Sequence, residues 1–594
     1  MNFLRNVAAA ILGTFISLGL LFFLFIAIIV ASASSDAFSG GGIPATIHSN
    51  SVLALQLQKP IVDHIASESE LEEVLGLEPA AFGLDALIRS IEVAENDDRI
   101  EGISIQFPFI SAGFSQTQAL RRALDNFKKS GKFVFAYHEY YTQKDYYLAS
   151  VADSLFLHPQ GEVDFKGLAS EVLYFKDFEE KSGLSVEVIR HGKYKSAVEP
   201  FLQNTMSNEN RTQIKELLWS LWETVTTDME QSGLLDKPSL NKIATQLEGR
   251  NSERALESGL VHQLVERDEY EAVLKNKVGI AMDDDLHLVS IQDYLSSLPS
   301  SINLKTKNKI AVIYAQGEIV YGEGNKETIG QEIMIEALEE IQNDDRIKGV
   351  VLRINSPGGS ALASELILRK LVTTKSTKPL VVSLGDVAAS GGYYIACMGD
   401  EIIAESSTIT GSIGVFGALP NARGLANKWG INAEQVATHP NAVGYSVFEP
   451  LSESFRKVTT ESIEKVYNTF VKRVAKGRGL TYEQVNKIAQ GRVWSGLDAK
   501  KIGLVDDLGG LDKALERTAS LAKISEYNIT VYPKYKDDFQ DILKELQNGP
   551  FGKIHQTGIQ SELKKTIGPL LRSIERFSNQ EGIQARLPFE LIIK

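Results

Sequence analysis

The sequence of 594 residues contains one cysteine, Cys397. An intrachain disulfide is therefore impossible, and zinc or iron–sulfur sites that need several cysteines are excluded. Basic residues are outnumbered by acidic ones: 62 lysines and arginines against 76 aspartates and glutamates give a formal net charge of −14. Without a basic stripe to hold a phosphate backbone, nucleic-acid binding is not expected. We expect neither a cofactor nor a bound metal ion.

Charge is missing altogether from residues 6–35. Residues 7–33 are almost wholly apolar, and about 20 such residues suffice to cross a bilayer core as a helix. Since Arg5 precedes this run and an aspartate follows it, we predict an uncleaved signal anchor with a cytoplasmic N-terminus, over residues 1–35. Cleavage after the small residues at its end is the alternative. The Ser- and Gly-rich residues 36–49 are expected to act as a tether.

The sequence repeats itself. The stretch NDDRIEG at residues 96–102 recurs as NDDRIKG at residues 343–349, and a pair of tyrosines matches at the same offset. Self-similarity at a fixed offset indicates a duplication. We predict tandem repeats over residues 50–300 and 301–545, followed by a C-terminal helical extension over residues 546–594 to which no role is assigned.

Apolar runs alternate with helical patterns within each copy. In the second copy, strands are expected at residues 309–315, 349–354, 379–384 and 401–405, and helices at residues 331–343, 364–374, 452–478 and 481–490. This alternation, with short connections, predicts an α/β layered fold with mostly parallel sheets.

Three glycine-containing turns distinguish the second copy. The turn NSPGG at residues 355–359 follows an apolar strand and can point backbone N–H groups outward, as an oxyanion hole requires. The turn AASGG places Ser390 between a strand and a helix, where the helix N-terminus adds positive potential. The third is TGSIG, at residues 410–414. At the positions equivalent to the first two turns, the first copy has other residues. If these turns served only packing, both copies should carry them, so packing alone does not explain their sequences.

A serine hydroxyl becomes a good nucleophile only when a base takes its proton. Histidine is the usual base, but none lies between His287 and His439, which makes His439 the one histidine candidate. Lysine is the other solution, and Lys193 and Lys195 of the first-copy segment HGKYKSAVEP are candidates. To act near neutral pH, the lysine pKa must fall from about 10.4 to about 8, as burial in an apolar pocket achieves. A surface cation beside Glu199 is the alternative interpretation of Lys195.

These motifs resemble those of the protease IV, or signal peptide peptidase A, family in its long, tandem-repeat bacterial form. Members of that family are membrane-anchored serine peptidases related to the Clp protease and crotonase folds. The resemblance covers essentially the whole chain and is most specific at residues 192–200, 355–359, 385–393 and 410–414. It implies that Ser390 is the nucleophile and that Lys195, rather than Lys193, is the general base.

The resemblance further implies that Ser412 orients the lysine and that the backbone N–H groups of Gly359 and Gly391 form the oxyanion hole. The implied substrates are cleaved signal peptides and similar extended apolar peptides, hydrolysed through an acyl-enzyme. The implied setting is a homotetramer at the bacterial inner (plasma) membrane, bound to the lipid bilayer through residues 7–33 as a single-pass protein with its catalytic repeats on the periplasmic side. Two alternatives remain: a crotonase-like acyl-CoA hydratase or thioesterase, and a non-catalytic membrane scaffold.

Overall fold

The computed structural model describes residues 47–66, 80–106, 109–298, 305–535 and 584–586, and the isolated positions 13, 17, 19 and 20. Within these residues, no helix combines the length and the apolar character needed to cross a bilayer. Most of the predicted anchor, most of the tether and most of the C-terminal extension lie outside the described residues.

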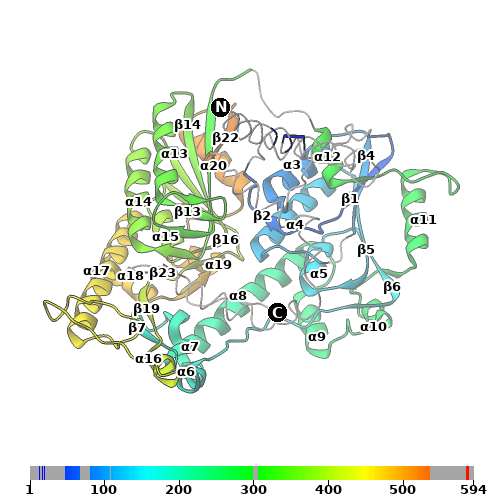
Figure 1. Cartoon of the computed structure of the whole chain (residues 1–594). Coiled ribbons are helices and arrows are strands. Elements are labelled where there is room, and N and C mark those ends of the chain that lie inside the picture. Colours follow the sequence, from blue (N-terminus) through cyan, green and yellow to red (C-terminus); the bar gives the residue numbers. More distant parts are fainter. Residues whose placement is uncertain are drawn as a thin grey trace.

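The N-terminal half is built on a parallel sheet with strand order β8-β6-β5-β4-β1-β9. Helices pack on both faces of this sheet (Figure 1), so a central strand such as β1 is buried along its whole length, as is usual for parallel sheets. The main elements are β1 (Ser51–Leu55), α3 (Leu84–Glu95), β4 (Ile100–Ile105), α4 (Phe114–Lys129), β5 (Phe133–Tyr141), α5 (Gln143–Ala149), β6 (Ser154–Val163), β8 (Gln263–Leu264) and β9 (Leu288–Ser290).

The C-terminal half contains a second sheet with the order β20-β18-β16-β14-β10-β22, in which β17 also pairs with β16 and β21 pairs with β17. Its neighbouring strands are parallel except for β18 and β20. The elements are β10 (Lys309–Gln316), α13 (Gln331–Asn343), β14 (Ile347–Ser356), α14 (Ala361–Lys375), β16 (Leu380–Ala389), α15 (Gly391–Ala396), β17 (Glu401–Ala404), β18 (Ile409–Gly411), α17 (Glu453–Arg478), α18 (Tyr482–Ile488), β20 (Val493–Ser495), α19 (Gly496–Lys501), β21 (Asp507–Leu508), α20 (Leu511–Ala522) and β22 (Asn528–Tyr532). The strands and helices expected from the sequence are confirmed here, with ends that differ by a few residues.

The same order of strands and helices opens both halves, and equivalent residues make equivalent contacts. Tyr146 and Tyr393 each donate a hydrogen bond of 2.7 Å to a leucine carbonyl oxygen, that of Leu260 and that of Leu504. In both NDDRI turns the arginine pairs with the first aspartate, at 2.7 and 2.8 Å. The duplication seen in the sequence is therefore present in the packing as well.

A third sheet joins the two halves, with the order β12-β13-β11-β15-β23-β19-β7. Strand β7 (Ser185–His191) comes from the first half but pairs antiparallel with β19 (Val415–Asn421) of the second. Strand β23 (Gln584–Arg586) lies between β19 and β15 (Gly358–Ser360), antiparallel to both. Many strand pairs in this sheet are antiparallel, although mostly parallel sheets were predicted. Consecutive strands joined by a crossover helix run parallel, whereas strands from distant segments of the chain can pair in either direction. The other members are β11 (Glu318–Val320), β12 (Gly324–Asn325) and β13 (Thr328–Gly330).

The remaining elements of the first half connect its sheet to the second half. Helix α8 (Asn208–Gln231) runs from the region of β7 toward the first sheet along the lower part of the molecule in Figure 1. The others are β2 (Ile61–Val62), β3 (Phe82–Gly83), α6 (Lys176–Ser182), α7 (Glu199–Leu202), α9 (Lys237–Gln246), α10 (Ser252–Glu257), α11 (Arg267–Val278) and α12 (Ile291–Ser297), with α16 (Arg423–Lys428) in the second half.

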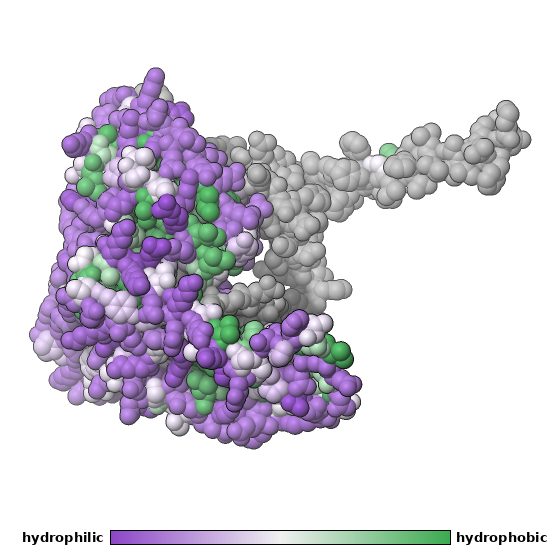
Figure 2. Space-filling view, turned by 90° about the vertical axis from the view of Figure 1, so that its left-hand side faces the viewer, coloured by the Kyte–Doolittle hydropathy of each residue, from purple (hydrophilic) through white to green (hydrophobic). Residues whose placement is uncertain are grey.

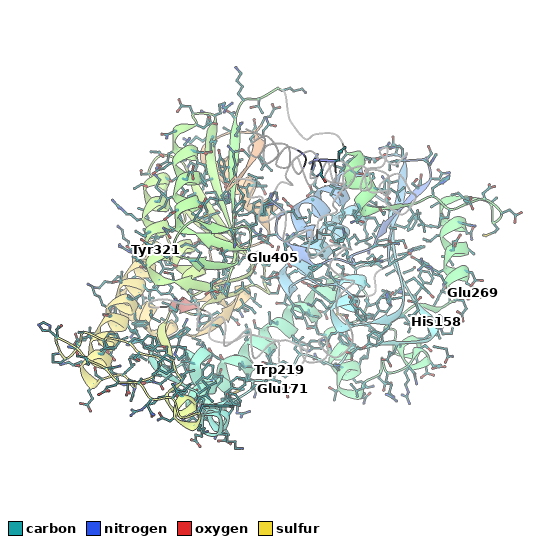
Figure 3. The ribbon with its side chains drawn as sticks, viewed as in Figure 1. His158, Glu171, Trp219, Glu269, Tyr321 and Glu405 are labelled. Carbon is teal, nitrogen blue, oxygen red and sulfur yellow. The ribbon has the colours of Figure 1, made fainter. Side chains whose placement is uncertain are left out.

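Ion pairs link the two halves where their sheets face each other. Arg353 of β14 and Asp63, which follows β2, pair at 2.7 Å with almost no exposure of either side chain. Arg122 of α4 pairs with the buried Glu405 at 2.8 Å, and Figure 3 places Glu405 between the halves. Because separating two buried charges leaves each of them uncompensated, these pairs hold the halves in one relative position.

Hydrophobic side chains are exposed along the irregular segment that follows α16. The face seen in Figure 2 is mostly hydrophilic and carries separate hydrophobic patches. The exposed hydrophobic residues of the segment are Trp429, Ile431, Val436, Val443, Tyr445, Val447 and Phe448. Such a concentration is typical of a surface that contacts another molecule.

Candidate active site

Ser390 lies at the junction of β16 and α15, as the sequence predicts. Its backbone has φ 55° and ψ −113°, a positive φ that is uncommon for a residue other than glycine and that marks a sharp, strained strand-to-helix turn. The Ser390 amide donates to the Gly411 carbonyl oxygen at 2.8 Å. In the first turn of α15, a Cβ added to Gly392 would lie 2.7 Å from the Ser356 carbonyl oxygen. Glycine is thus needed where the start of α15 meets the end of β14.

Lys195 reaches this serine from the other half of the molecule. The antiparallel pairing of β7 with β19 carries the chain across, and the segment after β7 enters the second half. The Lys195 Nζ atom lies 2.9 Å from Ser390 Oγ, 2.9 Å from Ser412 Oγ and 3.1 Å from the Ser412 carbonyl oxygen. The structure therefore brings together the three side chains singled out in the sequence.

The Lys195 side chain is fully buried, with an exposed fraction of 0%. Its amine lies 5.9 Å from the centre of the Phe416 ring. Its stem passes so close to two glycines that a Cβ on Gly491 would lie 2.6 Å from the Lys195 Cβ atom, and one on Gly414 would lie 3.1 Å from its Cδ atom. This burial lowers the pKa of the Lys195 amine well below its usual range, because a charged ammonium loses its hydration there.

The structure contradicts the interpretation of Lys195 as a surface cation beside Glu199. The Glu199 carboxylate is buried and accepts hydrogen bonds from Asn210, Gln203 and the Ser207 amide. Among the described residues, no carboxylate forms an ion pair with Lys195. No carboxylate there stabilises the charged form of the amine.

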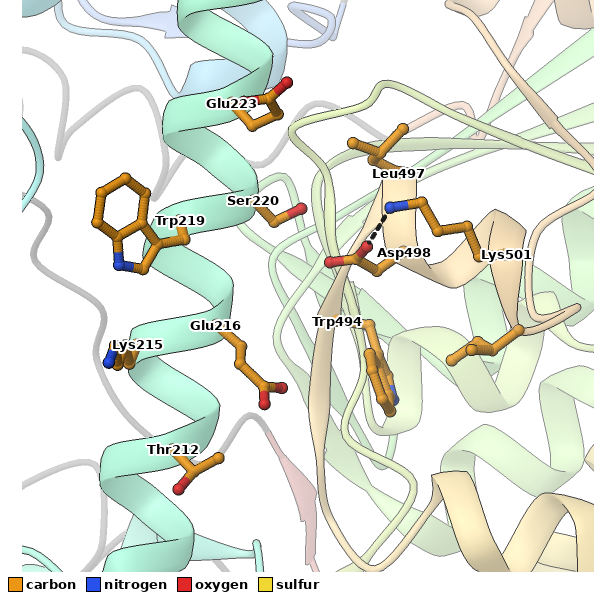
Figure 4. A pocket seen from close by; sticks show the side chains of 11 residues that line it. Thr212, Lys215, Glu216, Trp219, Ser220, Glu223, Trp494, Leu497, Asp498 and Lys501 are labelled. Atoms are coloured by element: carbon orange, nitrogen blue, oxygen red, sulfur yellow. Dashed lines mark hydrogen bonds and ion pairs between the residues drawn. The ribbon is translucent and has the colours of Figure 1, made fainter. Parts of the chain in front are cut away.

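Helix α8 supports the loop that carries Lys195. The Gln213 side-chain amide donates to the Tyr194 carbonyl oxygen at 3.1 Å and to Ser196 Oγ at 2.9 Å, one on each side of Lys195. Further along α8, Ser220 Oγ lies 2.6 Å from Ser495 Oγ of the second half. A surface pocket opens between α8 and α19 (Figure 4), and none of the three candidate side chains lines it.

Gly359 and Gly391 face a carbonyl oxygen of the chain itself. In the register of β15 with β23, Gly359 is opposite Ala585. A Cβ on Gly391 would lie 3.0 Å from the Ala585 oxygen and 3.1 Å from the Gly359 nitrogen. A Cβ on Gly358 would lie 2.1 Å from the same oxygen and 2.8 Å from the Gly391 nitrogen. The backbone nitrogens of Gly359 and Gly391 thus both lie near the Ala585 carbonyl oxygen.

The rival bases lie elsewhere. Lys193 is exposed, and its amine lies over the Tyr194 ring, 5.2 Å from the ring centre. His439 is exposed on the segment after α16, where its Nδ1 atom lies 3.1 Å from Thr438 Oγ1. In the described part of the chain, no cluster of three or more residues could hold a metal ion.

In the first half, the place equivalent to the serine turn is filled differently. Lys144 donates to the Ala112 carbonyl oxygen at 2.5 Å. Asp145 accepts from the Ile110 amide at 2.7 Å and from Thr142 Oγ1 at 2.5 Å. Lys144 and Asp145 therefore make structural hydrogen bonds with adjacent segments of the first half. No serine occupies the position equivalent to Ser390.

Sequence reasoning missed one group beside the nucleophile. Asp386, four residues before Ser390, accepts the Ser115 and Gln116 amides at the start of α4, at 2.8 and 3.1 Å. Burial and the nearby Asp63 charge raise the Asp386 pKa to about 6. The available signal was a charged residue directly after the predicted apolar strand at residues 379–384 and close to the serine turn, since charged residues are rarely buried without partners.

The chain was compared with known proteins. Residues 126–281 and 373–525 match the model of peptidase family S49, and residues 303–410 match that of Clp protease. Protease 4 of Haemophilus influenzae is 35% identical over 566 residues, 92% of this chain and 90% of the relative. Protease 4 of Salmonella typhi is 35% identical over 530 residues, 86% and 84% of the two chains. The chloroplastic serine protease SPPA of Arabidopsis thaliana is 30% identical over 554 residues, 91% and 78% of the two chains.

An α/β fold with Clp-protease-like repeats, together with these relatives along almost the whole chain, defines a serine peptidase. More specifically, the chain belongs to peptidase family S49.

Proposed function

We propose that Ser390 is the nucleophile and Lys195 the general base of a Ser–Lys dyad. The observation that carries this proposal is the buried contact of 2.9 Å between Lys195 Nζ and Ser390 Oγ. A neutral amine has two N–H groups and one lone pair. When the N–H groups donate to the Oγ and carbonyl oxygens of Ser412, the lone pair is left for the Ser390 hydroxyl proton. Ser412 therefore orients the lysine.

The reaction then follows from the positions of these groups. Ser390 Oγ attacks the carbonyl carbon of a peptide bond while Lys195 takes the hydroxyl proton. The N–H groups of Gly359 and Gly391 stabilise the negative charge on the carbonyl oxygen. Lys195 gives the proton to the leaving amine, and an acyl group remains on Ser390. Lys195 next deprotonates a water molecule, which hydrolyses the acyl-enzyme and frees the serine.

The substrates of this site are cleaved signal peptides and similar extended apolar peptides. A peptide that lies between β15 and β19 pairs its backbone with both strands, and the position of β23 supports this mode. Only a chain without its own tertiary structure can supply such a strand. Folded exported proteins are therefore not cleaved. Membership of a peptidase family favours peptide-bond hydrolysis over the alternatives of acyl-CoA chemistry and a membrane scaffold.

The enzyme acts at the bacterial inner membrane, anchored through residues 7–33 with its catalytic halves on the periplasmic side. The apolar run in the sequence and the polarity of its flanks support this placement. Apolar peptides partition to the bilayer surface, so an anchor raises their effective concentration at the site. The protein assembles as a homotetramer, and the exposed hydrophobic residues after α16 supply a surface for subunit contacts.

The dyad is tested with the full-length chain in detergent and a fluorogenic peptide. Ser390→Ala and Lys195→Ala should each lower kcat/KM by at least about 1,000-fold, because each removes a group that acts in the transition state. His439→Ala should keep the wild-type value. Full activity of Lys195→Ala would refute the dyad. A synthetic signal peptide should be cleaved and a folded secreted protein left intact; cleavage of the folded protein would contradict the substrate proposal.

A further inference from the structure

Helix α8 carries a glutamine whose side chain is buried at the border between the two halves. Gln213 has an exposed fraction of 1%. Its carboxamide nitrogen donates to the Tyr194 carbonyl oxygen and to Ser196 Oγ, which belong to the residues on either side of Lys195. Because a buried hydrogen bond is costly to leave unmade, the loop that carries Lys195 cannot shift freely away from α8.

The oxygen of the same carboxamide reaches the second half. Gln213 Oε1 accepts a hydrogen bond of 3.4 Å from the Val493 amide of β20. Strand β20 stands at the edge of its sheet, where a buried amide must find a partner outside the sheet. The preceding residue, Arg492, accepts the Ser412 amide at its carbonyl oxygen, at 2.7 Å. One side chain therefore connects the loop of Lys195 with the strand that holds Ser412.

The separation of these two segments matters for the direction of the amine. Lys195 Nζ contacts both the carbonyl oxygen and the Oγ atom of Ser412, at 3.1 and 2.9 Å. These two contacts determine which way the amine lone pair points, and both depend on the distance between the Lys195 loop and β20. Gln213 bonds to both sides of that gap, so it sets the distance.

A glutamine suits this position because it is polar but uncharged. Burial lowers the pKa of the Lys195 amine, and a carboxylate beside the loop would oppose that effect by stabilising the ammonium form. A carboxamide offers donors and an acceptor in one group without adding such a charge. The loop is thus held firmly while the lysine stays neutral.

We propose that Gln213 is a positioning residue of the reaction: it holds Lys195 against Ser412 so that the amine lone pair points at Ser390. The inference rests on the function proposed above. Gln213 touches neither the nucleophile nor the cleft between β15 and β19, so it acts on catalysis through the lysine. Its loss should therefore lower kcat and leave peptide binding unchanged.

Steady-state kinetics of the full-length chain in detergent test the proposal with a peptide substrate. Gln213→Met keeps the length of the side chain but loses its hydrogen bonds, and it should lower kcat about 10–100-fold with KM within about twofold of wild type. Ser220→Ala is the matched control, because it removes a contact of 2.6 Å between the same helix and Ser495 of the second half. It should keep the wild-type kcat. A wild-type kcat in Gln213→Met, or an equal loss in Ser220→Ala, would overturn the assignment.

A milder variant applies if thermal unfolding shows that Gln213→Met does not fold. Ser196→Ala removes one acceptor of the Gln213 carboxamide and keeps the glutamine itself. It should lower kcat about 3–10-fold, the value of one hydrogen bond, with KM unchanged. A wild-type kcat in this variant would then overturn the assignment.

A double-mutant cycle separates this inference from the proposed function. The rate at which a serine-directed reagent acylates Ser390 would be measured in Lys195→Ala with and without Gln213→Met. If Gln213 acts through the amine, the second substitution should leave the already low rate unchanged. A further fall by the factor seen in the wild-type background would contradict the inference and leave the dyad standing. Acylation of Lys195→Ala at the full wild-type rate would overturn the dyad and this inference together.

Discussion

Lys195 Nζ lies 2.9 Å from Ser390 Oγ, although the two residues come from different halves of the molecule. Lys195 follows β7, which crosses to pair with β19, whereas Ser390 directly follows β16 of the second sheet. The pair consequently exists only while the halves are docked. A change that loosens the docking should reduce activity even when both sheets remain folded.

Ser412→Ala should lower kcat by about 10–100-fold, the value of one buried hydrogen bond of about 1–3 kcal/mol, with little change in KM. The variant keeps the carbonyl oxygen that accepts from Lys195 but loses the hydroxyl. Steady-state kinetics on a peptide substrate measure the effect. Ser376→Ala, which removes an exposed hydroxyl, is the control and should match wild type. An unchanged kcat in Ser412→Ala would show that the hydroxyl does not orient the lysine.

Gly358→Ala should lower kcat/KM by at least about 100-fold, because the added methyl group takes the space of the substrate carbonyl oxygen between the two backbone nitrogens. Gly322→Ala is a close control. Gly322 has φ 103° and Gly358 has φ 102°, so the backbone strain is alike, but no atom lies within 4 Å of the added Cβ. Equal losses in the two variants would attribute the effect to backbone strain and not to the site.

Asp386→Asn should stabilise the protein above pH 6. The Asp386 pKa of about 6 exceeds its unfolded value, so the folded state binds more protons between about pH 4 and 6 and stability falls as pH rises through that window. Asparagine keeps an oxygen for the Ser115 and Gln116 amides but carries no charge. We expect a gain of about 1–2 kcal/mol at pH 7.5, less than the full pKa difference implies because the side chain is partly exposed.

Urea unfolding of wild type and Asp386→Asn between pH 4.5 and 8 measures this gain. The gain should shrink to about a third of its full value at pH 4.5 and should vanish only below about pH 4, where this carboxyl is protonated in the unfolded state as well. A gain that is the same at every pH would indicate a cause other than the carboxylate charge.

Asp63→Asn should destabilise the protein by about 3–5 kcal/mol, because it leaves the buried guanidinium of Arg353 without its charge partner. It should also lower kcat, since Arg353 lies on β14 just before the turn that carries Gly358. The exposed pair of Asp344 with Arg346 is the control, and Asp344→Asn should cost about 0–1 kcal/mol. Thermal unfolding together with peptide kinetics tests both effects, and equal costs for the two variants would contradict them.

The sequence was sufficient to predict the elements of the second half and to single out the Ser390 turn, whereas the choice of Lys195 over Lys193 and the role of Ser412 came from the family resemblance. Buried parallel strands are continuous apolar runs, such as VVL in β14, and the turns between them carry glycine. Strands and turns can therefore both be predicted from short stretches of sequence. The duplication added a comparison within one chain, which separated Ser390 from the unreactive turn at Lys144. That comparison also drew attention to Lys195.

The third sheet could not be predicted in the same way. Strand β7 pairs with β19 more than two hundred positions away, and β23 has three residues, too few for a periodic pattern. The local sequence around Lys195 is equally compatible with a surface cation, because its burial depends on Phe416 and Gly491 from the other half. Long-range packing, rather than local propensity, determines the state of this lysine.

The central claim is that a neutral Lys195 activates Ser390, and acylation of the serine measures it directly. Wild type and Lys195→Ala would be treated with a serine-directed acylating reagent over a range of pH, and mass spectrometry would locate and quantify the adduct. We predict an adduct on Ser390 whose rate of formation rises with pH through the lowered pKa of the lysine, and a rate at least about 100-fold lower in Lys195→Ala. Modification of Ser390 in Lys195→Ala at the wild-type rate would contradict the account.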